Sequence, residues 1–263
     1  MANRALLVGI NNYPGASLNG CVNDVNDMAN LLTSRYGFKS NEIRVIVNNR
    51  ATAKEISLRC KWLAQCKPGD NVLFQFSGHG VQYPARNQKD EIDNLLECIA
   101  PYDFDWSRGR MLADKDLVKI FSQIPKNVKF NWISDSCHSG DLSRNMSQVI
   151  QVPKQYPVPF DMEWRIQCAN ELELKPDTRN MINNVLDVGF ISGCKSNQTS
   201  ADTTVNGRPC GALTHYFIKN LKEHDKNAPL RKIVEETSKE LASLGYSQKP
   251  QAEGARKDKP FLQ

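Results

Sequence analysis

Apolar residues recur along the first two-thirds of the chain in two alternating patterns. Helical spacing is clearest over 22–36, where Val25, Met28 and Leu32 recur on one face and Gly37 ends the run. A second helix is expected from Thr52, which reads as an N-cap with Glu55 three positions later. Further helices are expected over about 114–123, 211–223 and 229–244. Short apolar runs at 4–10, 43–47, 71–76, 97–100, 130–134 and 185–192 read as strands.

Strands that alternate with helices predict an α/β fold with a mainly parallel sheet. The stretch 141–184 breaks this rhythm, because it holds four prolines among polar residues and shows no sustained period. A long irregular stretch inside a compact domain is usually functional or disordered. The polar and basic tail, 247–259, is expected to be poorly packed.

Composition narrows the class of protein. The 34 basic and 29 acidic residues leave a net charge of only +5, spread along the chain. Nucleic-acid binders concentrate positive charge, so no nucleic-acid partner is expected. No apolar stretch is long enough to cross a membrane, and no signal peptide is evident, so we expect a cytoplasmic protein. The eight cysteines form no CxxC pair and are expected to be reduced.

Two of the expected strands end in segments that carry candidate chemistry. The strand at 71–76 runs into Ser77-Gly-His79-Gly, and the strand at 130–134 runs into Asp135-Ser-Cys137-His138-Ser-Gly. Active sites of parallel sheets form outside the carboxyl ends of the strands. A thiol and an imidazole are the minimum for nucleophilic catalysis. His138 is an alternative base, but side chains adjacent in an extended segment point apart, which favours His79.

These two segments, 58 positions apart from His79 to Cys137, resemble the metacaspases and the prokaryotic orthocaspases. The resemblance implies a caspase–hemoglobinase-like three-layer sandwich, with a mainly parallel sheet and helices on both faces. It implies a single peptidase domain, 1–263, divided into a large-subunit-like region (about 1–140), a linker (141–184) and a small-subunit-like region (185–263). Other stretches that match the family are Asn19–Asp24, Glu97–Pro101, Ile191–Cys194 and Gln198–Asp202.

The resemblance also implies roles for particular residues. Cys137 corresponds to the nucleophile and His79 to the general base, and the amides of Gly80 and Cys137 correspond to the oxyanion hole. Two carboxylates beside a nucleophile would pair with a cationic substrate side chain, so cleavage after Arg or Lys is expected. Taken alone, Asp24 is explained more simply as an acidic residue in the first turn of a helix, where its charge interacts favourably with the helix dipole, than as a pocket residue. The implied S1 pocket consists of Cys21, Asp24, Ser77 and Asp135.

Calcium activates many members of the family through clustered acids. Hard oxygen ligands suit calcium, but Lys115 and Arg144 place cations where the family often has acids. We therefore expect no required cofactor, with calcium as a candidate only. The candidate ligands are Asp90, Asp93, Asp114 and Asp116.

The linker also offers candidate sites of self-cleavage. Lys154, Lys175 and Arg179 rank above Arg144, which lies close to the active-site turn, and above Arg165, which lies in a stretch that can be helical. The expected partners are protein or peptide substrates with Arg or Lys before the cut bond, and the expected state is a monomer. The main alternative is a catalytically inactive caspase-like binding module. A legumain-like or gingipain-like peptidase is a further alternative. A nucleotide-binding function is excluded, because no strand is followed by a Gly-rich phosphate-binding loop.

Overall fold

The structure, a computed structural model, describes residues 2–263 except for 87–91, 139–150, 175–181, 184–185 and 195–197. Its centre is a six-stranded sheet in the order β12-β9-β7-β3-β1-β2. Five of the strands are parallel, and only β12 runs antiparallel to its neighbour β9. The strands are β1 (Asn3–Gly9), β2 (Ile43–Val47), β3 (Asn71–Ser77), β7 (Lys129–Asp135), β9 (Val188–Ser192) and β12 (Gln251–Glu253).

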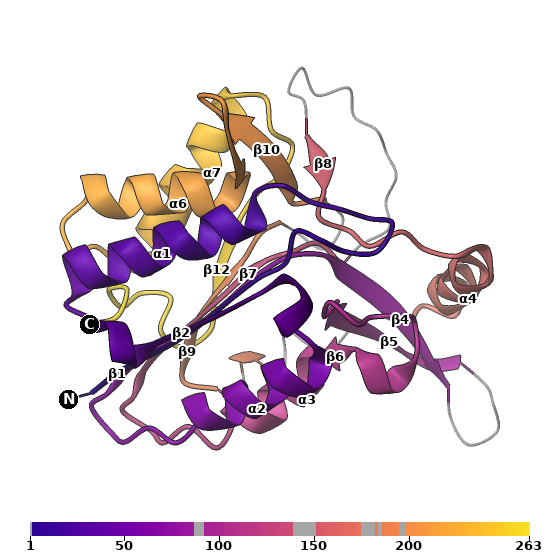
Figure 1. Ribbon diagram of the computed structural model, residues 1–263, viewed down its shortest axis with the longest axis horizontal. Coiled ribbons are helices and arrows are strands. Elements are labelled where there is room, and N and C mark those ends of the chain that lie inside the picture. The colour runs from indigo at the N-terminus through magenta and orange to yellow at the C-terminus, as the bar shows by residue number, and fades with distance from the viewer. Residues whose placement is uncertain (1, 87–91, 139–150, 175–181, 184–185, 195–197) are drawn as a thin grey trace.

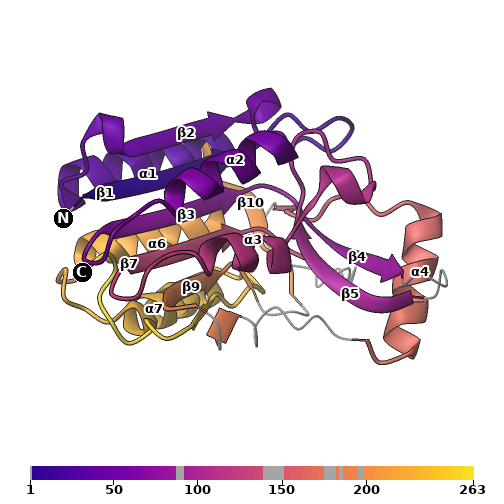
Figure 2. The same cartoon turned by 90° about the horizontal axis from the view of Figure 1, so that it is seen from below.

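Helices cover both faces of this sheet (Figures 1 and 2). On one face lie α1 (Cys21–Tyr36), α6 (Ala212–Glu223) and α7 (Leu230–Ser243), and on the other lie α2 (Ala53–Leu63) and α3 (Asp114–Phe121). Short 3-10 helices are found at Ser40–Glu42, Asn48–Arg50 and Arg108–Arg110.

The apolar runs form strands that are buried on both sides. In β1, Leu6 and Val8 belong to the core beneath α2 and α3, whereas Ala5 and Leu7 belong to the core beneath α1, α6 and α7. Alternate side chains of a strand point to opposite faces, so a sheet covered on both sides needs apolar residues at every position. The predicted three-layer α/β sandwich is confirmed.

Two small sheets flank the central one, and the sequence patterns did not predict most of their strands. The first consists of β4 (Gly80–Arg86), β5 (Ile92–Ile99) and β6 (Leu112–Ala113). The second consists of β8 (Val152–Pro153), β10 (Ala201–Val205) and β11 (Arg208–Gly211). The short strand expected at 97–100 is the end of the longer β5.

The expectation of a poorly packed tail is wrong, and the linker is more ordered than its lack of a sustained period suggests. The described part of the linker contains β8 and the helix α4 (Phe160–Glu171), which packs against β4 and β5 (Figure 2), so the helical stretch expected around Arg165 is confirmed. The tail contains β12, which hydrogen-bonds to the outer edge of β9, and it is followed by buried Phe261 and Leu262. The unpaired edge of β9 explains why a polar tail becomes ordered, since pairing satisfies its backbone groups.

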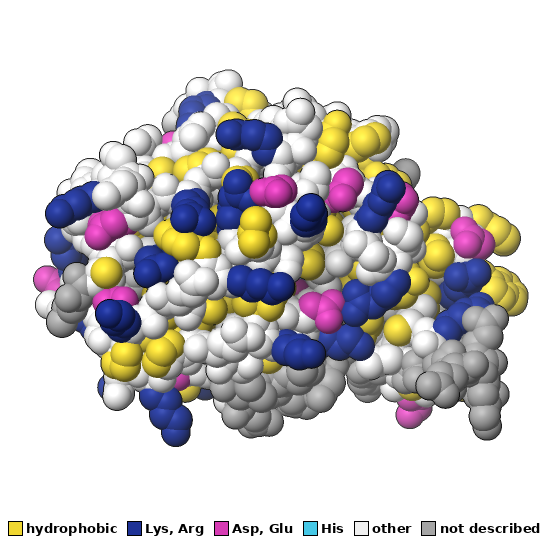
Figure 3. All heavy atoms as spheres, turned by 60° about the horizontal axis from the view of Figure 1, so that its bottom comes forward, with side chains coloured by type: hydrophobic (Ala, Val, Ile, Leu, Met, Phe, Trp, Pro, Cys, Tyr) yellow, Lys and Arg dark blue, Asp and Glu magenta, His cyan; other side chains and the backbone are white. Residues whose placement is uncertain are grey.

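The described helices include none that is long and apolar enough to cross a membrane. On the face shown in Figure 3, lysine and arginine side chains are spread among acidic and neutral ones and form no continuous basic patch over the described residues.

Candidate active site

The strands β3 and β7 bring the two predicted segments together. They are parallel neighbours, and Ser77 at the end of β3 lies opposite Asp135 at the end of β7. His79 and Cys137 each lie two positions beyond this register pair, so the spacing of 58 is the register offset between the two strands. The carboxyl ends of adjacent strands thus deliver the imidazole and the thiol to one edge of the sheet.

His79 is buried, and its ring is held by a hydrogen bond. Nε2 lies 2.7 Å from the carbonyl oxygen of Ala16. Because a carbonyl can only accept, Nε2 carries the proton and Nδ1 is the basic nitrogen. Burial lowers the pKa of His79 to about 4, and the charge of Lys154 lowers it further, while the carbonyls of Ala16 and Lys154 oppose the shift. The neutral imidazole therefore predominates at neutral pH.

Cys137 is buried beside a second thiol. Its Sγ donates to the carbonyl oxygen of Gln198 at 2.7 Å. Sγ of Cys194 lies 3.7 Å from Sγ of Cys137 and donates to the same carbonyl at 3.0 Å. Cys194 appeared in the sequence only as part of a matching stretch, and the structure places it next to the predicted nucleophile.

The predicted oxyanion donors converge on one backbone carbonyl. The amides of Gly80 and Cys137 both donate to the carbonyl oxygen of Lys154, at 3.0 and 3.1 Å. Two amides aimed at one carbonyl oxygen are the arrangement that stabilises negative charge as the carbon is attacked. The close approach of the two segments requires Gly80, because a Cβ there would lie 2.4 Å from the carbonyl oxygen of Cys137.

The side chain of Lys154 enters the predicted S1 pocket. It is fully buried, with a relative accessibility of 0%. Its Nζ lies 3.1 Å from Oδ2 of Asp24, 3.0 Å from Oδ2 of Asp135 and 2.9 Å from Oγ of Ser77. The structure therefore brings three of the four predicted pocket residues into contact with one ammonium group.

The charges in this pocket depend on one another. Burial raises the pKa of Asp24 to about 6, and Asp135 raises it too, while Lys154 and the hydrogen bond from Ser77 lower it. Burial opposes the charge on Lys154, but Asp135 and Asp24 outweigh it and raise the pKa of the ammonium well above its ordinary value. Two buried carboxylates repel each other, so a cation is the ligand that the pocket favours.

Cys21, the fourth predicted pocket residue, is buried at the start of α1. Burial strongly raises the pKa of its thiol, the charge of Lys154 lowers this pKa, and the charge of Asp24 raises it. Cys21 thus borders the pocket as a neutral group.

Residues of β11, of α6 and of the segment just before β10 complete the pocket, and the sequence analysis assigned none of them a place in it. Ser200 and Thr214 donate their hydroxyls to Asp135, each at 2.7 Å, and the amide of Gly211 donates to Asp24 at 2.8 Å. A Cβ on Gly211 would lie 2.3 Å from Nζ of Lys154, so only glycine leaves room for the cation.

Asp202 of β10 holds the start of α1 in place. Its carboxylate accepts hydrogen bonds from the amides of Asn19 and Gly20, at 2.7 and 2.9 Å. This contact fixes the helix end that carries Asp24.

The segment around Lys154 binds as an added strand. Val152 and Pro153 of β8 pair antiparallel with Asp202 and Ala201 of β10 (Figure 1). The amide of Lys154 donates to the carbonyl of Ser200 at 2.9 Å. Strand addition to a sheet edge, with alternate side chains in pockets, is a common way to bind an extended peptide.

Of the four candidate metal ligands, the structure describes the side chains of Asp114 and Asp116 only, and these two do not share a cluster of ligands. Asp114 is buried, and burial and the charge of Glu97 raise its pKa. Asp116 instead pairs with Arg108 at 2.9 Å. Ligand atoms of Glu97, Asp114 and His138 lie within 4.8 Å of one another. Calcium needs six to eight oxygens, so this set of two carboxylates and an imidazole does not fit it.

Two further predicted residues lie in named elements, and Arg165 pairs with Asp161 one turn earlier in its helix. Asp93 lies in β5, with its side chain outside the described part of the structure, and Arg165 lies in α4. Four other predictions lie outside the described residues, namely those on Asp90, Arg144, Lys175 and Arg179.

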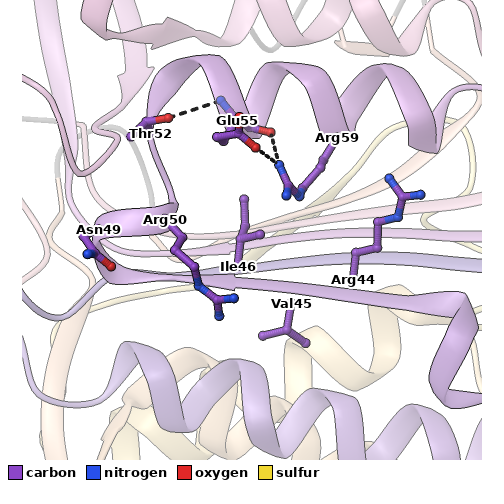
Figure 4. A pocket seen from close by; sticks show the side chains of 8 residues that line it. All are labelled: Arg44, Val45, Ile46, Asn49, Arg50, Thr52, Glu55 and Arg59. Atoms are coloured by element: carbon purple, nitrogen blue, oxygen red, sulfur yellow. Dashed lines mark hydrogen bonds and ion pairs between the residues drawn. The ribbon is translucent and has the colours of Figure 1, made fainter.

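A second hollow, of about 420 Å³, lies between β2 and α2 (Figure 4). It is lined by Arg44, Arg50 and Arg59 together with Glu55, which pairs with Arg59. None of the residues that line it carries a thiol or an imidazole.

Comparisons with known proteins identify the family of the chain. The family model described as "Caspase domain" matches residues 2–262. Metacaspase-1 of Kluyveromyces lactis is 33% identical over 94% of this chain, and metacaspase-2 of Trypanosoma brucei brucei is 30% identical over 96%. The chain spans 65% of the length of the first of these proteins and 73% of the second.

Solved structures show the same fold. The protein GSU0716 of Geobacter sulfurreducens superposes with a TM-score of 0.71 at 22% identity, over 100% of this chain and 99% of its own. Caspase-1 of Spodoptera frugiperda superposes with a TM-score of 0.59 at 12% identity, over 97% and 87% of the two chains. The resemblance predicted from the motifs is confirmed, and the chain therefore belongs to the caspase-domain family, as a relative of the metacaspases.

Proposed function

We propose that this protein is a cysteine endopeptidase that cuts after Lys or Arg. One observation carries the proposal: Lys154 lies across the site in the position of a substrate. Its carbonyl oxygen accepts from the amides of Gly80 and Cys137, while its ammonium lies between Asp24 and Asp135. The residue before the scissile bond (P1) is then Lys154, and the bond to be cut joins Lys154 to Gln155.

The proposed reaction uses a Cys137–His79 dyad. His79 takes the proton of the Cys137 thiol at Nδ1, and the sulfur attacks the carbonyl carbon of the P1 residue. The oxyanion that forms is stabilised by the two amides. The C–N bond then breaks, His79 gives its proton to the leaving amine, and an acyl-thioester remains on Cys137. Water hydrolyses this thioester and restores the thiol.

The bound segment also supports self-processing at Lys154. While Lys154 fills the pocket, no other substrate side chain can enter it, so the uncut chain blocks its own site. Cutting after Lys154 separates it from the bridge between Gln155 and Gly80, so that Lys154 keeps the pairing of the two-residue strand β8 but loses the anchor beyond the bond, and it can leave the pocket for other peptides. Arg fits the same pocket chemistry, because a guanidinium can bind two carboxylates.

A scan of fluorogenic peptides that differ only at P1 tests this function. Peptides with Lys or Arg should be cut, and those with Ala, Gln or Asp should be cut at least about 100-fold more slowly, since a buried carboxylate pair discriminates by several kcal/mol. Efficient cleavage after Asp would contradict the acidic pocket. Binding of the Lys peptides without any cleavage would favour the inactive binding module.

The pH dependence should report the charge of the pocket. We expect kcat/KM for a Lys peptide to fall as the pH decreases, because protonation of Asp24 removes one of the two charges that bind the ammonium. The pKa of Asp24 is about 6 with the charge of Lys154 beside it, which lowers the pKa, so the limb of the empty pocket should lie at or above this value. The pKa of His79, about 4, lies below this limb. The pH dependence of kcat/KM is measured for wild type and for Asp24→Asn. An unchanged acidic limb in Asp24→Asn would mean that another group causes the decrease.

Removal of metal should leave substantial activity. The described residues offer no calcium-like set of oxygens, and Lys115 places a cation next to Asp114. The measurement is cleavage of a Lys peptide in excess EGTA, with added calcium as the control. If cleavage required added calcium and EGTA abolished it, Asp90, Asp93 and their neighbours would form a working calcium site.

A further inference from the structure

The bound segment continues past Lys154 and so shows where the leaving side of a substrate lies. Gln155 forms a parallel bridge with Gly80, and the amide of Tyr156 donates to the carbonyl of Gly80 at 3.0 Å. Gly80 therefore holds the chain on both sides of the proposed scissile bond, through its amide to Lys154 and its carbonyl to Tyr156. This places Tyr156 at the second position after the cut (P2′).

The ring of Tyr156 enters a cluster of aromatic side chains. Its centroid lies 5.1 Å from that of Phe104 and 5.7 Å from that of Tyr13, at interplanar angles of 82° and 75°. It also lies 5.6 Å from the ring of His79, at 88°. All three contacts have the edge-to-face geometry that aromatic pairs prefer.

The walls of this cluster belong to the folded core and not to the linker. Phe104 is buried and packs against Trp106, with 5.2 Å between the ring centroids. Tyr13 is buried, and its hydroxyl donates to the carbonyl of Ala100 at 2.8 Å and accepts from the amide of His79 at 3.1 Å. The subsite thus persists whichever peptide occupies it.

The hydroxyl of Tyr156 contributes little to this contact. It reaches the carbonyl of Pro14 at 3.4 Å, at the solvent-exposed end of the ring. The ring itself makes the contacts, so phenylalanine should serve as well as tyrosine.

From these contacts we infer a prime-side subsite, formed by Tyr13, Phe104 and the ring of His79, that selects an aromatic residue at P2′. The inference rests on the proposed peptidase function and adds a second specificity element to it. An aromatic P2′ side chain also covers His79 and excludes water from the base, so it should raise the rate of cleavage as well as the affinity.

Internally quenched peptides with the sequence of residues 151–158 test the subsite. The position of Tyr156 is varied to Phe, Leu and Ala, and a Val-Pro-Lys coumarin amide, which has no P2′ residue, is the reference substrate. We expect kcat/KM for the Tyr and Phe peptides to be similar and about tenfold above that for the Ala peptide, with Leu between them.

Matched variants locate the effect. Phe104→Ala should reduce the ratio of Tyr to Ala peptides to about two, and Phe104→Leu should retain part of it. Trp164→Ala, which removes a 61% exposed aromatic side chain on α4, should leave the ratio unchanged. The coumarin rate of each variant corrects for any loss of folded enzyme.

Equal rates for the Tyr and Ala peptides in the wild type, with the coumarin amide cleaved, would overturn the subsite and leave the peptidase function standing. A preference that survives in Phe104→Ala, in a variant that still cleaves the coumarin amide, would also overturn it. No cleavage of the coumarin amide by the wild type would instead contradict the proposed function itself.

Discussion

Replacing Cys137 with alanine should reduce cleavage of Lys peptides to less than about one-thousandth of the wild-type rate, because the only proposed nucleophile is lost. His79→Ala should have nearly the same effect, since the thiol then lacks its base. Both variants should fold, because neither side chain supports a helix or a strand pair. Steady-state cleavage and thermal melting, measured side by side, check both expectations.

Cys194→Ala is the matched control for this loss. Its sulfur lies 3.7 Å from that of Cys137 and has the same carbonyl partner. Cys194→Ala should retain cleavage of Lys peptides. If Cys194 were the nucleophile, Cys194→Ala would lose this activity and Cys137→Ala would retain it. Retention of a tenth of wild-type turnover in Cys137→Ala would mean that Cys194 or Cys21 supplies the thiol.

The second large effect concerns the acidic pocket. Asp24→Asn and Asp135→Asn should each lower kcat/KM for Lys and Arg peptides by about 100-fold or more, because each removes one partner of a buried charge pair. The two carboxylates lie 3.1 and 3.0 Å from Nζ of Lys154, where solvent does not screen them. Kinetics with Lys, Arg and Gln peptides measure the change.

Asp27→Asn provides the control for this pair. Asp27 lies on the same helix as Asp24 but pairs with Arg208 at the surface. It should change kcat/KM by less than about twofold, because exposed ion pairs contribute little. Equal losses in Asp27→Asn and Asp24→Asn would point to a disturbed helix instead of a lost pocket charge.

The sequence allows the two catalytic candidates to be predicted for a physical reason. Parallel strands in register present their ends at one edge, so a thiol and an imidazole that each follow an apolar run come together. The same reasoning places Ser77 and Asp135 in the pocket, since they are the last residues of those strands.

The rest of the pocket depends on contacts between distant segments. Gly211 and Ser200 act on Asp24 and Asp135 from strand ends that no periodic pattern marks. One signal was available: Asn206-Gly207, a dipeptide typical of tight hairpins, has φ angles of 51° and 78° and joins β10 to β11.

Binding of Lys154 in the pocket could not be predicted from local patterns. The strand β8 has only two residues, and its partner β10 lies 48 positions later in the chain, as the pairing of Pro153 with Ala201 shows. A two-residue strand has no alternation to detect. The sequence identified Lys154 as one of three preferred candidate sites of self-cleavage, but nothing in it singled out Lys154 as the residue that fills the pocket.

Self-cleavage is tested most directly by measuring the intact mass of the uncut chain over time and by mapping the termini of the fragments that form. We predict that the wild type cuts itself between Lys154 and Gln155, giving fragments of about 17 and 12 kDa from a chain of 29.7 kDa. The rate should not change on dilution, because substrate and nucleophile belong to one molecule. Lys154→Arg should still be cut at this bond, whereas Lys154→Gln and Cys137→Ala should not. A wild-type chain that stays whole while it cleaves added Lys peptides, or equal cutting of wild type and Cys137→Ala, would contradict the account.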